Sequence, residues 1–370
     1  MDQRVTITAY APGRVNLIGE HTDYTNGYVL PMAVDLGVTC TVTPRTDRLL
    51  AVTSAQFPGD EVRVDVDQVQ PGDLQGWATY VVGTAWALRE QGVAVPGADI
   101  HIDSTVPAGA GLSSSAAVEC AVALALLALA GVQMAPREVA RVAKRAENAF
   151  VGAPTGSMDQ VASMLSQRDA LLFFDTGLDV TRNVPFPLAE AGFHLLVIDT
   201  HIHHQLVTDE YGERRRALEA ATEQLGIASL RDLEDPAVVE TLTDPVLRRR
   251  ARHVVTENAR VLRTVELLEV GDIEAVGSIL IAGHASLRDD LEVSCRELDV
   301  AVEAAVAAGA TGARMVGGGF GGSVIALVPE SQVVAVKRGV LDAYAAHGLR
   351  APDVYDVMPA DGARLLHISS

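Results

Sequence analysis

The sequence predicts an α+β protein of two domains. Strand-like segments gather in the first hundred residues, the stretch 205–308 is almost wholly helical, and strands return before the end. Strands and helices that come in runs, rather than in strict alternation, are typical of an α+β fold. The 370 residues are enough for two hydrophobic cores. We place the boundary between them after residue 190, which gives domains 1–190 and 191–370.

Alternating apolar and polar residues predict the first strands, and apolar residues at helical spacing predict the first helices. The early strands are expected at 4–10, 38–43, 49–53, 61–66 and 98–103, with a helix at 76–90. Further helices are expected at 115–130, 136–150 and 157–166. The helical stretch 205–308 is preceded by strands at 169–174 and 192–199. It is followed by strands at 312–316, 323–328 and 354–358 and by a helix at 331–346.

The amino-acid composition limits which kinds of partner this protein can bind and where in the cell it is expected. The formal charge of −19 argues against nucleic acid or an anionic membrane as the main partner, because both need a basic footprint. The apolar run 121–132 is shorter than the about 20 residues that cross a bilayer, and it predicts a buried helix. Three widely separated cysteines and no basic, apolar leader indicate a cytoplasmic protein. Nothing indicates an obligatory protein partner.

The first polar motif is APGRVNLIGEHTDY, residues 11–24, directly after a predicted strand. Glu20, His21 and Asp23 bring two carboxylates and an imidazole into four residues. Such groups suit the recognition of several adjacent hydroxyls, because each accepts or donates a hydrogen bond in a fixed direction. Any one of them taken alone would be read as part of a charged turn. The cluster favours a hydroxyl-rich ligand.

The second motif is VPAGAGLSSSAAV, residues 106–118, between a predicted strand and the buried helix. Gly109 and Gly111 let the backbone approach a ligand closely. The free N–H groups at a helix start form a phosphate site without lysine, and a serine hydroxyl there can ligate Mg²⁺. A flexible turn with a helix cap explains the same residues. This loop alone leaves both interpretations open.

The third motif comprises two carboxylates in the next two predicted helices. Glu147 lies at the edge of the apolar stripe of 136–150, where a carboxylate needs a partner, either a bound metal ion or a neighbouring arginine. On the spacing alone an arginine salt bridge is the simpler interpretation. Asp159 lies in the first turn of the following helix, which favours the ionised form that a base requires. Ordinary aspartates also gather at that position.

The fourth motif is GARMVGGGFGGSVIALV, residues 312–328. It contains a formal G-x-G-x-x-G, but a strand follows it rather than the helix that dinucleotide binding requires. The glycines indicate a backbone brought close either to a ligand or to a neighbouring segment. Glycines alone do not distinguish these.

In this order the motifs resemble those of the galactokinase family within the GHMP kinase superfamily. GRVNLIGEHTDY resembles the galactokinase signature, and GAGLSSSAA and GARMVGGGFGGS resemble the second and third superfamily motifs. The segment DEYGERRRALE at 209–219 resembles the galactokinase sugar-side segment. The resemblance implies two α+β domains with the active site between them. The N-terminal domain would contain a left-handed βαβ crossover, which the usual right-handed rule does not predict, and the C-terminal domain would be ferredoxin-like.

The resemblance also implies roles for individual residues. Asp159 would be the base for the C1 hydroxyl of galactose, and Arg14 would stabilise the transferring phosphoryl group of the co-substrate ATP. Ser115 and Glu147 would ligate Mg²⁺. The sugar site would be lined by Glu20, His21, Thr22, Asp23 and Tyr211. The ATP site would comprise Gly109, Ala110, Gly111, Leu112, Ser113, Ser114 and Ser115, with Ser54 nearby.

One alternative to a galactose 1-kinase is a kinase for arabinose, N-acetylgalactosamine or a uronic acid. Another is a galactokinase-like sugar sensor, which would bind ATP and galactose but signal through a protein partner. Thr155 stands where many relatives have cysteine, close to the expected sugar. His201, His203 and His204 raise the separate possibility of a zinc site. Successive strand residues point to opposite faces, which argues against convergence of His203 and His204 on one ion.

Overall fold

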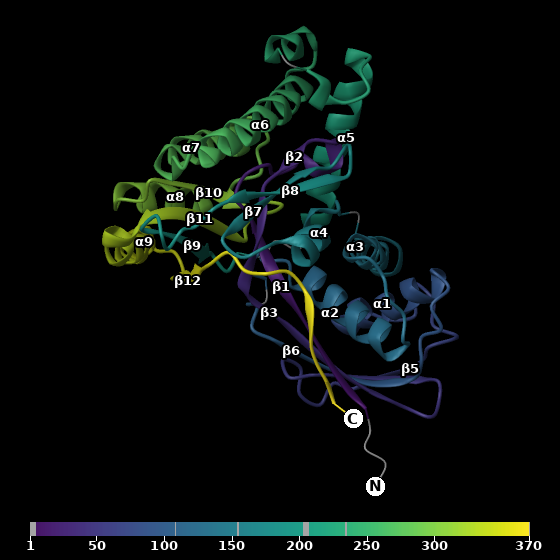
Figure 1. The fold of residues 1–370 in the computed structure, drawn as a ribbon. Coiled ribbons are helices and arrows are strands. Elements are labelled where there is room, and N and C mark those ends of the chain that lie inside the picture. The colour runs from purple at the N-terminus through teal and green to yellow at the C-terminus, as the bar shows by residue number, and fades with distance from the viewer. Residues whose placement is uncertain (1–4, 108, 154, 203–206, 234, 370) are drawn as a thin grey trace.

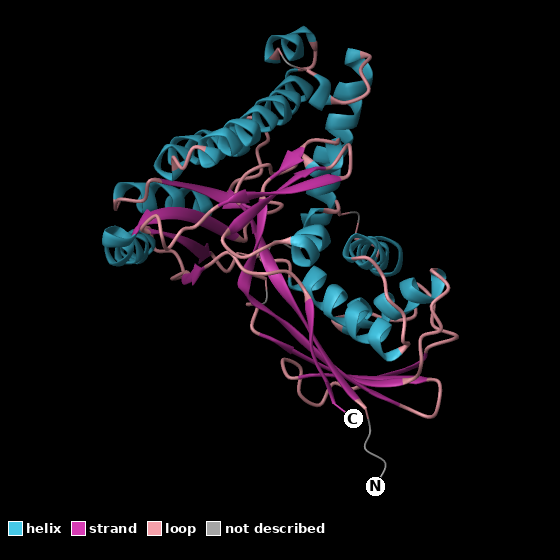
Figure 2. Ribbon diagram, in the orientation of Figure 1, coloured by secondary structure: helices cyan, strands magenta, loops and turns pink. Residues whose placement is uncertain are grey.

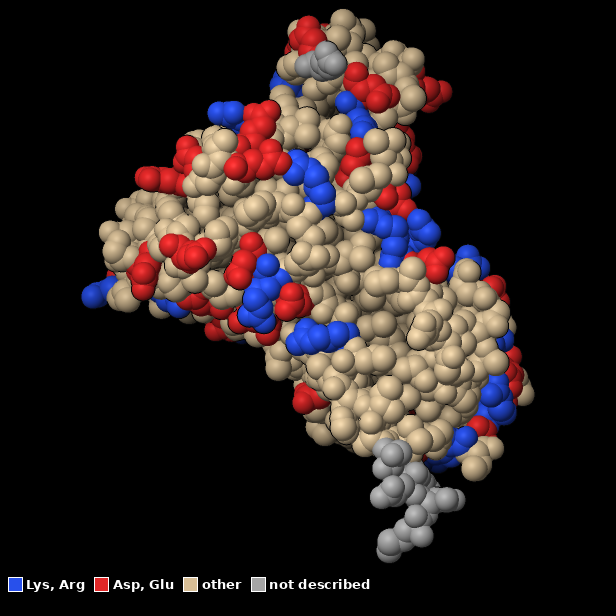
Figure 3. All heavy atoms as spheres, in the orientation of Figure 1, with Lys and Arg blue, Asp and Glu red and all other residues tan. Residues whose placement is uncertain are grey.

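The computed structural model describes residues 5–107, 109–153, 155–202, 207–233 and 235–369. Within these residues the chain forms a six-stranded, a four-stranded and a three-stranded sheet, with helices packed against them (Figures 1 and 2). The predicted α+β class is confirmed. On the face drawn in Figure 3, acidic and basic side chains are interspersed, and the acidic ones are most frequent over the upper and left parts.

The six-stranded sheet has the order β13-β1-β3-β6-β4-β5. Its strands are β1 (Thr6–Asn16), β3 (Pro31–Pro44), β4 (Leu49–Ser54), β5 (Val62–Asp65), β6 (Ala98–Ser104) and β13 (Arg364–Ser369). β4 and β6 pair in parallel, and the chain crosses between them through β5 and helix α1 (Ala78–Glu90). The other pairs are antiparallel.

Four helices lie on one side of this sheet (Figure 1). They are α1, α2 (Ser114–Leu129), α3 (Pro136–Arg145) and α4 (Met158–Leu165). One side of α2 packs against β1 and β3, and its remaining sides pack against α1, α3 and α4. Most of its residues are buried, which confirms the predicted buried helix. Its N-terminus is therefore held rigidly beside β1.

The four-stranded sheet is antiparallel, with the order β10-β11-β9-β12. Its strands are β9 (Phe193–Asp199), β10 (Gly312–Val316), β11 (Ser323–Pro329) and β12 (Asp353–Val357). Helix α8 (Arg296–Ala307) precedes β10, and α9 (Val333–Ala346) lies between β11 and β12. This strand order, with one helix before β10 and one before β12, is the predicted ferredoxin-like arrangement.

The central helices form an arm above the two larger sheets (Figure 1). They are α5 (Val207–Leu225), α6 (Pro245–Glu269) and α7 (Ile273–Asp289), with the 3₁₀ turns η3 (Leu230–Asp232) and η4 (Pro236–Thr241) between α5 and α6. The remaining sheet comprises β2 (Tyr28–Val29), β7 (Ala170–Asp175) and β8 (Val180–Pro185). The last 3₁₀ turns are η1 (Asp23–Thr25) and η5 (Glu330–Gln332). None of the helices among the described residues is long and apolar enough to cross a membrane.

Several elements differ from the prediction. β1 continues to Asn16, so the first polar motif begins inside a strand rather than after it. The helix expected over 136–150 ends at Arg145 and continues as a π-helix, η2 (Ala146–Val151). Strands β2, β8 and β13 were not predicted. The chain passes from the three-stranded sheet to the four-stranded sheet between β8 and β9, but the last strand, β13, belongs to the six-stranded sheet. The domain boundary after residue 190 therefore stays a prediction.

Candidate active site

Three side chains meet where β1, α2 and α4 come together. Arg14 on β1 forms a bidentate ion pair with Asp159, with its Nε 2.8 Å from Oδ1 and its Nη2 2.9 Å from Oδ2. The hydroxyl of Ser113 donates to Asp159 Oδ2. Arg14 is almost fully buried, and Asp159 retains about a fifth of its exposure. The sequence predicted catalytic roles for Arg14 and Asp159, and the fold brings them into contact.

The loop before α2 is attached to β1 by its backbone. Arg14 N donates to Leu112 O at 3.0 Å, and Arg14 Nη1 donates to Gly111 O at 2.7 Å. Ser113, the N-cap residue of α2, has φ +53°, a left-handed conformation that is uncommon outside glycine. Such conformations gather at functional sites. Here the conformation turns the chain so that the Ser113 hydroxyl faces Asp159.

A pocket of about 290 Å³ lies over this helix start. It is lined by Arg14, Pro107, Gly109, Gly111, Leu112, Ser113, Ser114, Ser115, Gly317 and Gly318. The free N–H groups at a helix N-terminus favour an anion, and the buried Arg14 adds a permanent cation. The loop of the second motif and the glycine loop of the fourth thus share one pocket. Gly317 and Gly318 line this pocket. A Cβ added at Gly319 or Gly321 would instead meet the backbone of Val293 or Ile202, so this glycine loop also packs closely against neighbouring segments.

Glu147 lies in the π-helix and faces the same region. Its Oε1 accepts from Ser115 Oγ at 3.0 Å, and its Oε2 accepts from Thr155 Oγ1 at 2.6 Å and from Gln160 Nε2 at 2.7 Å. Burial raises the pKa of Glu147 above its ordinary value. The interpretation as an arginine salt bridge is wrong, because the partners are neutral hydroxyl and amide groups. A buried carboxylate beside a serine hydroxyl is the oxygen donor set that Mg²⁺ prefers.

Asp23 lies beside the ion pair of Arg14 and Asp159. Its pKa is raised to about 6, first by burial and then by the negative charge of Asp159. The carboxyl group lies against the backbone of Gly156: a Cβ added at that glycine would be 2.5 Å from Asp23 Cγ. Asp23 and Asp159, far apart in sequence, therefore belong to one acidic site.

His21 and Thr22 are fixed by hydrogen bonds. His21 Nε2 is 3.1 Å from Gly318 O, and since a carbonyl only accepts, Nε2 carries the proton and Nδ1 accepts from Tyr24 Oη at 2.8 Å. Burial lowers the pKa of His21 to about 3, so the ring is neutral. The Thr22 hydroxyl contacts the carbonyls of Gly19 and Tyr28 at 2.8 and 2.7 Å. Thr22 thus shapes the turn with its side chain.

Glu20 is buried in an ion-pair network that extends into the C-terminal half of the chain. Its Oε2 lies 2.5 Å from Arg314 Nη2, and its Oε1 accepts from Gly317 N at 3.2 Å. Burial raises the pKa of Glu20 to about 7, although the Arg314 charge opposes that shift. Arg314 was not predicted as a site residue.

The remaining predicted residues are less closely tied to the pocket. Ser54 ends β4, donates from Oγ to Gln56 Oε1 at 3.2 Å and is not among the residues that line the pocket. Tyr211 belongs to α5, but its side chain lies outside what the structure describes. His203 and His204 lie outside the described residues, while His201 Nε2 is 3.1 Å from Asp353 Oδ2. The described residues contain no group of three or more histidine, cysteine or acidic side chains that could hold a metal.

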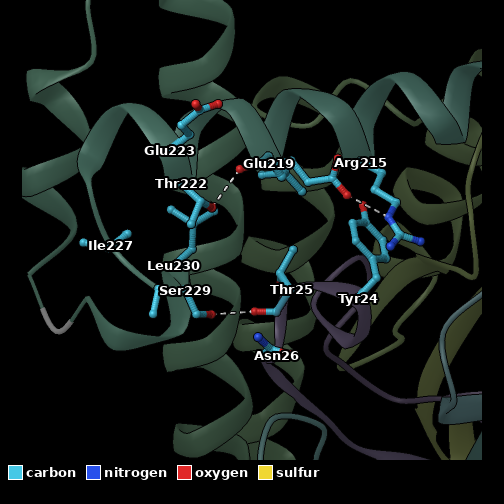
Figure 4. Close-up of a pocket in the computed structure, with 12 residues that line it drawn as sticks. Tyr24, Thr25, Asn26, Arg215, Glu219, Thr222, Glu223, Ile227, Ser229 and Leu230 are labelled. Atoms are coloured by element: carbon cyan, nitrogen blue, oxygen red, sulfur yellow. Dashed lines mark hydrogen bonds and ion pairs between the residues drawn. The ribbon is translucent and has the colours of Figure 1, made fainter.

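A second pocket, of about 330 Å³, borders the end of the first motif (Figure 4). Tyr24, Thr25 and Asn26 form one side of it, and residues of α5 and the segment before η3 form the other. Ser229 Oγ donates to Thr25 O at 2.7 Å, and the Arg215 guanidinium lies 6.0 Å from the centre of the Tyr24 ring. The contact of Arg215 with Tyr24 joins the first motif to α5, the helix that carries Tyr211.

Sequence reasoning missed four residues that shape the site: Gly156, Gln160, Arg314 and, except as a departure from relatives, Thr155. Gln160 follows Asp159 directly and hydrogen-bonds both Glu147 and the fully buried Glu119. One signal was available: Arg314 is the only charged residue in the short apolar strand ARMV. A buried charge of that kind requires a partner.

Comparison with known families agrees with this geometry. Residues 79–167 match the GHMP kinases N terminal domain, and residues 264–346 match the GHMP kinases C terminal family. Among solved structures, the chain resembles a Methanococcus jannaschii mevalonate kinase in fold, with a TM-score of 0.71 at 16% identity over 96% of this chain and 98% of that one. The protein is therefore a GHMP kinase.

Further matches identify the family within this superfamily. Residues 2–44 match the galactokinase galactose-binding signature. The chain is 49% identical to a galactokinase of Streptomyces coelicolor, over 96% of this chain and 93% of that protein, and 42% identical to one of Mycobacterium tuberculosis, over 97% and 99%. A crystal structure of Lactococcus lactis galactokinase complexed with galactose superposes with a TM-score of 0.93 at 32% identity, over 98% and 95%. The chain belongs to the galactokinase family, which confirms the resemblance.

Proposed function

We propose that this chain transfers the γ-phosphoryl group of ATP to the C1 hydroxyl of α-D-galactose. The observation that carries the proposal is the bidentate contact of Arg14 with Asp159 beside the Ser113-capped start of α2. It brings a permanent cation, a carboxylate and an anion-binding helix start together around one pocket. Phosphoryl transfer depends mainly on such positioning and charge stabilisation.

In this proposal Asp159 orients the C1 hydroxyl and accepts its proton, while Arg14 stabilises the negative charge that builds up on the transferring group. The loop from Gly109 to Ser115 holds the ATP phosphates with its backbone N–H groups and hydroxyls. Ser54 stays a prediction for the nucleotide side, since both hydrogen bonds of its hydroxyl are to Gln56.

Ser115 and Glu147 are the proposed Mg²⁺ ligands. Their oxygens are 3.0 Å apart, and Mg²⁺ commonly takes one or two protein ligands together with substrate phosphates. When bound, the ion would neutralise charge on the phosphates. Thr155 and Gln160 both donate to Glu147 Oε2, so they orient the carboxylate and leave Oε1 toward Ser115.

The sugar side is proposed to comprise Glu20, His21, Thr22, Asp23 and Tyr211. Asp23 contacts the turn before α4, which places its carboxyl group near Asp159. His21 is a neutral, oriented ring with a defined tautomer, as hydroxyl recognition requires. Buried polar groups of this kind discriminate strongly among sugars, because a missing hydroxyl leaves a partner unpaired.

The deciding experiment identifies the product that the wild-type chain forms from galactose and Mg-ATP by ³¹P and ¹³C NMR. A phosphate on C1 supports the proposal. In parallel, Asp159→Asn should lower kcat at least about 10³-fold while galactose binding stays measurable by calorimetry. Negligible turnover of galactose beside faster turnover of arabinose, N-acetylgalactosamine or a uronic acid would overturn the choice of sugar. Unchanged turnover by Asp159→Asn would overturn the assigned base.

We also infer a cytoplasmic location. All three cysteines are free thiols, two of them buried, as is usual in a reducing compartment.

A further inference from the structure

Arg314 is a fully buried arginine in β10 that bridges two carboxylates from different parts of the chain. Its Nη2 lies 2.5 Å from Glu20 Oε2, and its Nη1 lies 3.0 Å from Glu257 Oε1 on α6. Nη1 also donates to Leu17 O at 3.3 Å. One guanidinium therefore joins the first motif to α6 through a strand of the four-stranded sheet.

The backbone around Glu20 is held by the same elements. The Nε2 of His253 on α6 is 3.1 Å from Glu20 O, and since a carbonyl only accepts, this nitrogen donates. Glu257 Oε1 accepts from Gly19 N at 2.9 Å. Gly317 N donates to Glu20 Oε1. Both the carboxylate and the backbone of Glu20 are therefore held by residues from the C-terminal half of the chain.

The electrostatic balance at Glu20 depends on this network. Burial raises the pKa of its carboxyl group, the Glu257 charge raises it further, and Arg314 lowers it. The Gly317 N–H and the Asn16 side chain also stabilise the charged form. Glu257 is itself shared between Arg314 and Arg260, whose Nε is 2.7 Å from Oε2. The neighbouring rings of His21 and His253 are neutral, because burial lowers the pKa of each.

We propose that Arg314 is a positioning residue, which fixes the Glu20 carboxylate against the glycine loop so that one orientation faces the sugar. This inference rests on the proposed function, in which Glu20 borders galactose. The planar guanidinium suits the task because it reaches two carboxylates at once, whereas a lysine ammonium offers a point charge on a flexible stem.

The test compares three variants by their KM and kcat for galactose across pH. Arg314→Gln should raise KM about tenfold with kcat changed less than about threefold, and Arg314→Lys should recover part of that loss. Arg314→Gln should also move the acid limb of kcat/KM to higher pH, because it removes the charge that keeps Glu20 ionised. Glu257→Gln should move the limb to lower pH, because it removes a repelling charge.

Glu257→Gln keeps the test decisive if Arg314→Gln fails to fold. Arg137→Lys is the matched control: this partly buried arginine pairs with Asp179 and Thr181, outside the pocket, and its variant should leave KM and the acid limb unchanged. Opposite shifts in the Arg314 and Glu257 variants would support positioning. Lower melting temperatures with KM and the acid limb unmoved would mean a structural role alone and overturn the inference.

Glu20→Gln separates this inference from the proposed function. If it leaves KM for galactose unchanged, the sugar-side assignment of Glu20 is wrong and the inference falls with it. If Glu20→Gln raises KM while the Arg314 and Glu257 variants do not, the proposed function stands and only the inference about Arg314 fails.

Discussion

Replacing Gly156 by alanine should impair the enzyme through a neighbour rather than through the glycine itself. A Cβ at residue 156 would lie 2.5 Å from Asp23 Cγ, whereas ordinary contacts begin at 3.4 Å. Asp23 Oδ2 would lie nearer still, so the carboxyl group must move by more than about 1 Å. A displacement of about 1 Å in an active site is already expected to reduce the rate about 10²-fold. This corresponds to about 2.7 kcal/mol of transition-state stabilisation.

The assay is kcat/KM for galactose, followed by ADP release, in a double-mutant cycle with Asp23→Ala. In the Asp23→Ala background the additional Gly156→Ala change should have little effect, because the displaced group is gone. Melting temperatures of all four proteins separate loss of stability from loss of activity. An undiminished rate in Gly156→Ala, or an equal loss in both backgrounds, would refute the reasoning.

Two further predictions concern pH. Since the pKa of Asp23 is raised to about 6 and that of Glu20 to about 7, kcat/KM for galactose should fall as the pH drops from about 7 toward 5, and a profile flat over that interval would contradict the two assignments. Burial raises the pKa of Glu119 well above its ordinary 4.5, so the metal-free folded protein holds a proton there that the unfolded chain releases. The contribution of Glu119 to the free energy of unfolding is therefore at its maximum below about pH 4.5 and decreases as the pH rises. Glu119→Gln should therefore raise the melting temperature more at pH 8 than at pH 5; an equal change at both values would argue against a protonated Glu119.

The sequence predicted the helices and most strands because their apolar spacing is local. It missed β13 and β8, which are short, largely exposed strands with little pattern of burial. It also missed the change from α- to π-helix after Arg145, since no residue type signals it. Long-range pairing decides such elements, and periodicity within one segment does not report it.

The residues of the candidate site also fall into those that the sequence could predict and those that it could not. Arg14, Asp159, Ser115 and Glu147 could be found because their motifs resemble a known family. Which groups surround them could not, because Gln160, Gly156 and Arg314 act through contacts between segments distant in sequence. The partners of Glu147 illustrate the limit: helix periodicity favoured an arginine, whereas the fold supplies hydroxyl and amide donors.

The pairing of β13 with β1 bears on how this protein is handled. Thr6 lies opposite Ser369 at one end of the six-stranded sheet, so both described ends of the chain meet at the same corner (Figure 1). Deleting the last seven residues would leave the N-terminal half of β1 as an unprotected sheet edge, which invites association between molecules. Affinity tags and fusion partners at either end would approach each other there, and those attached through a flexible linker should disturb the edge least.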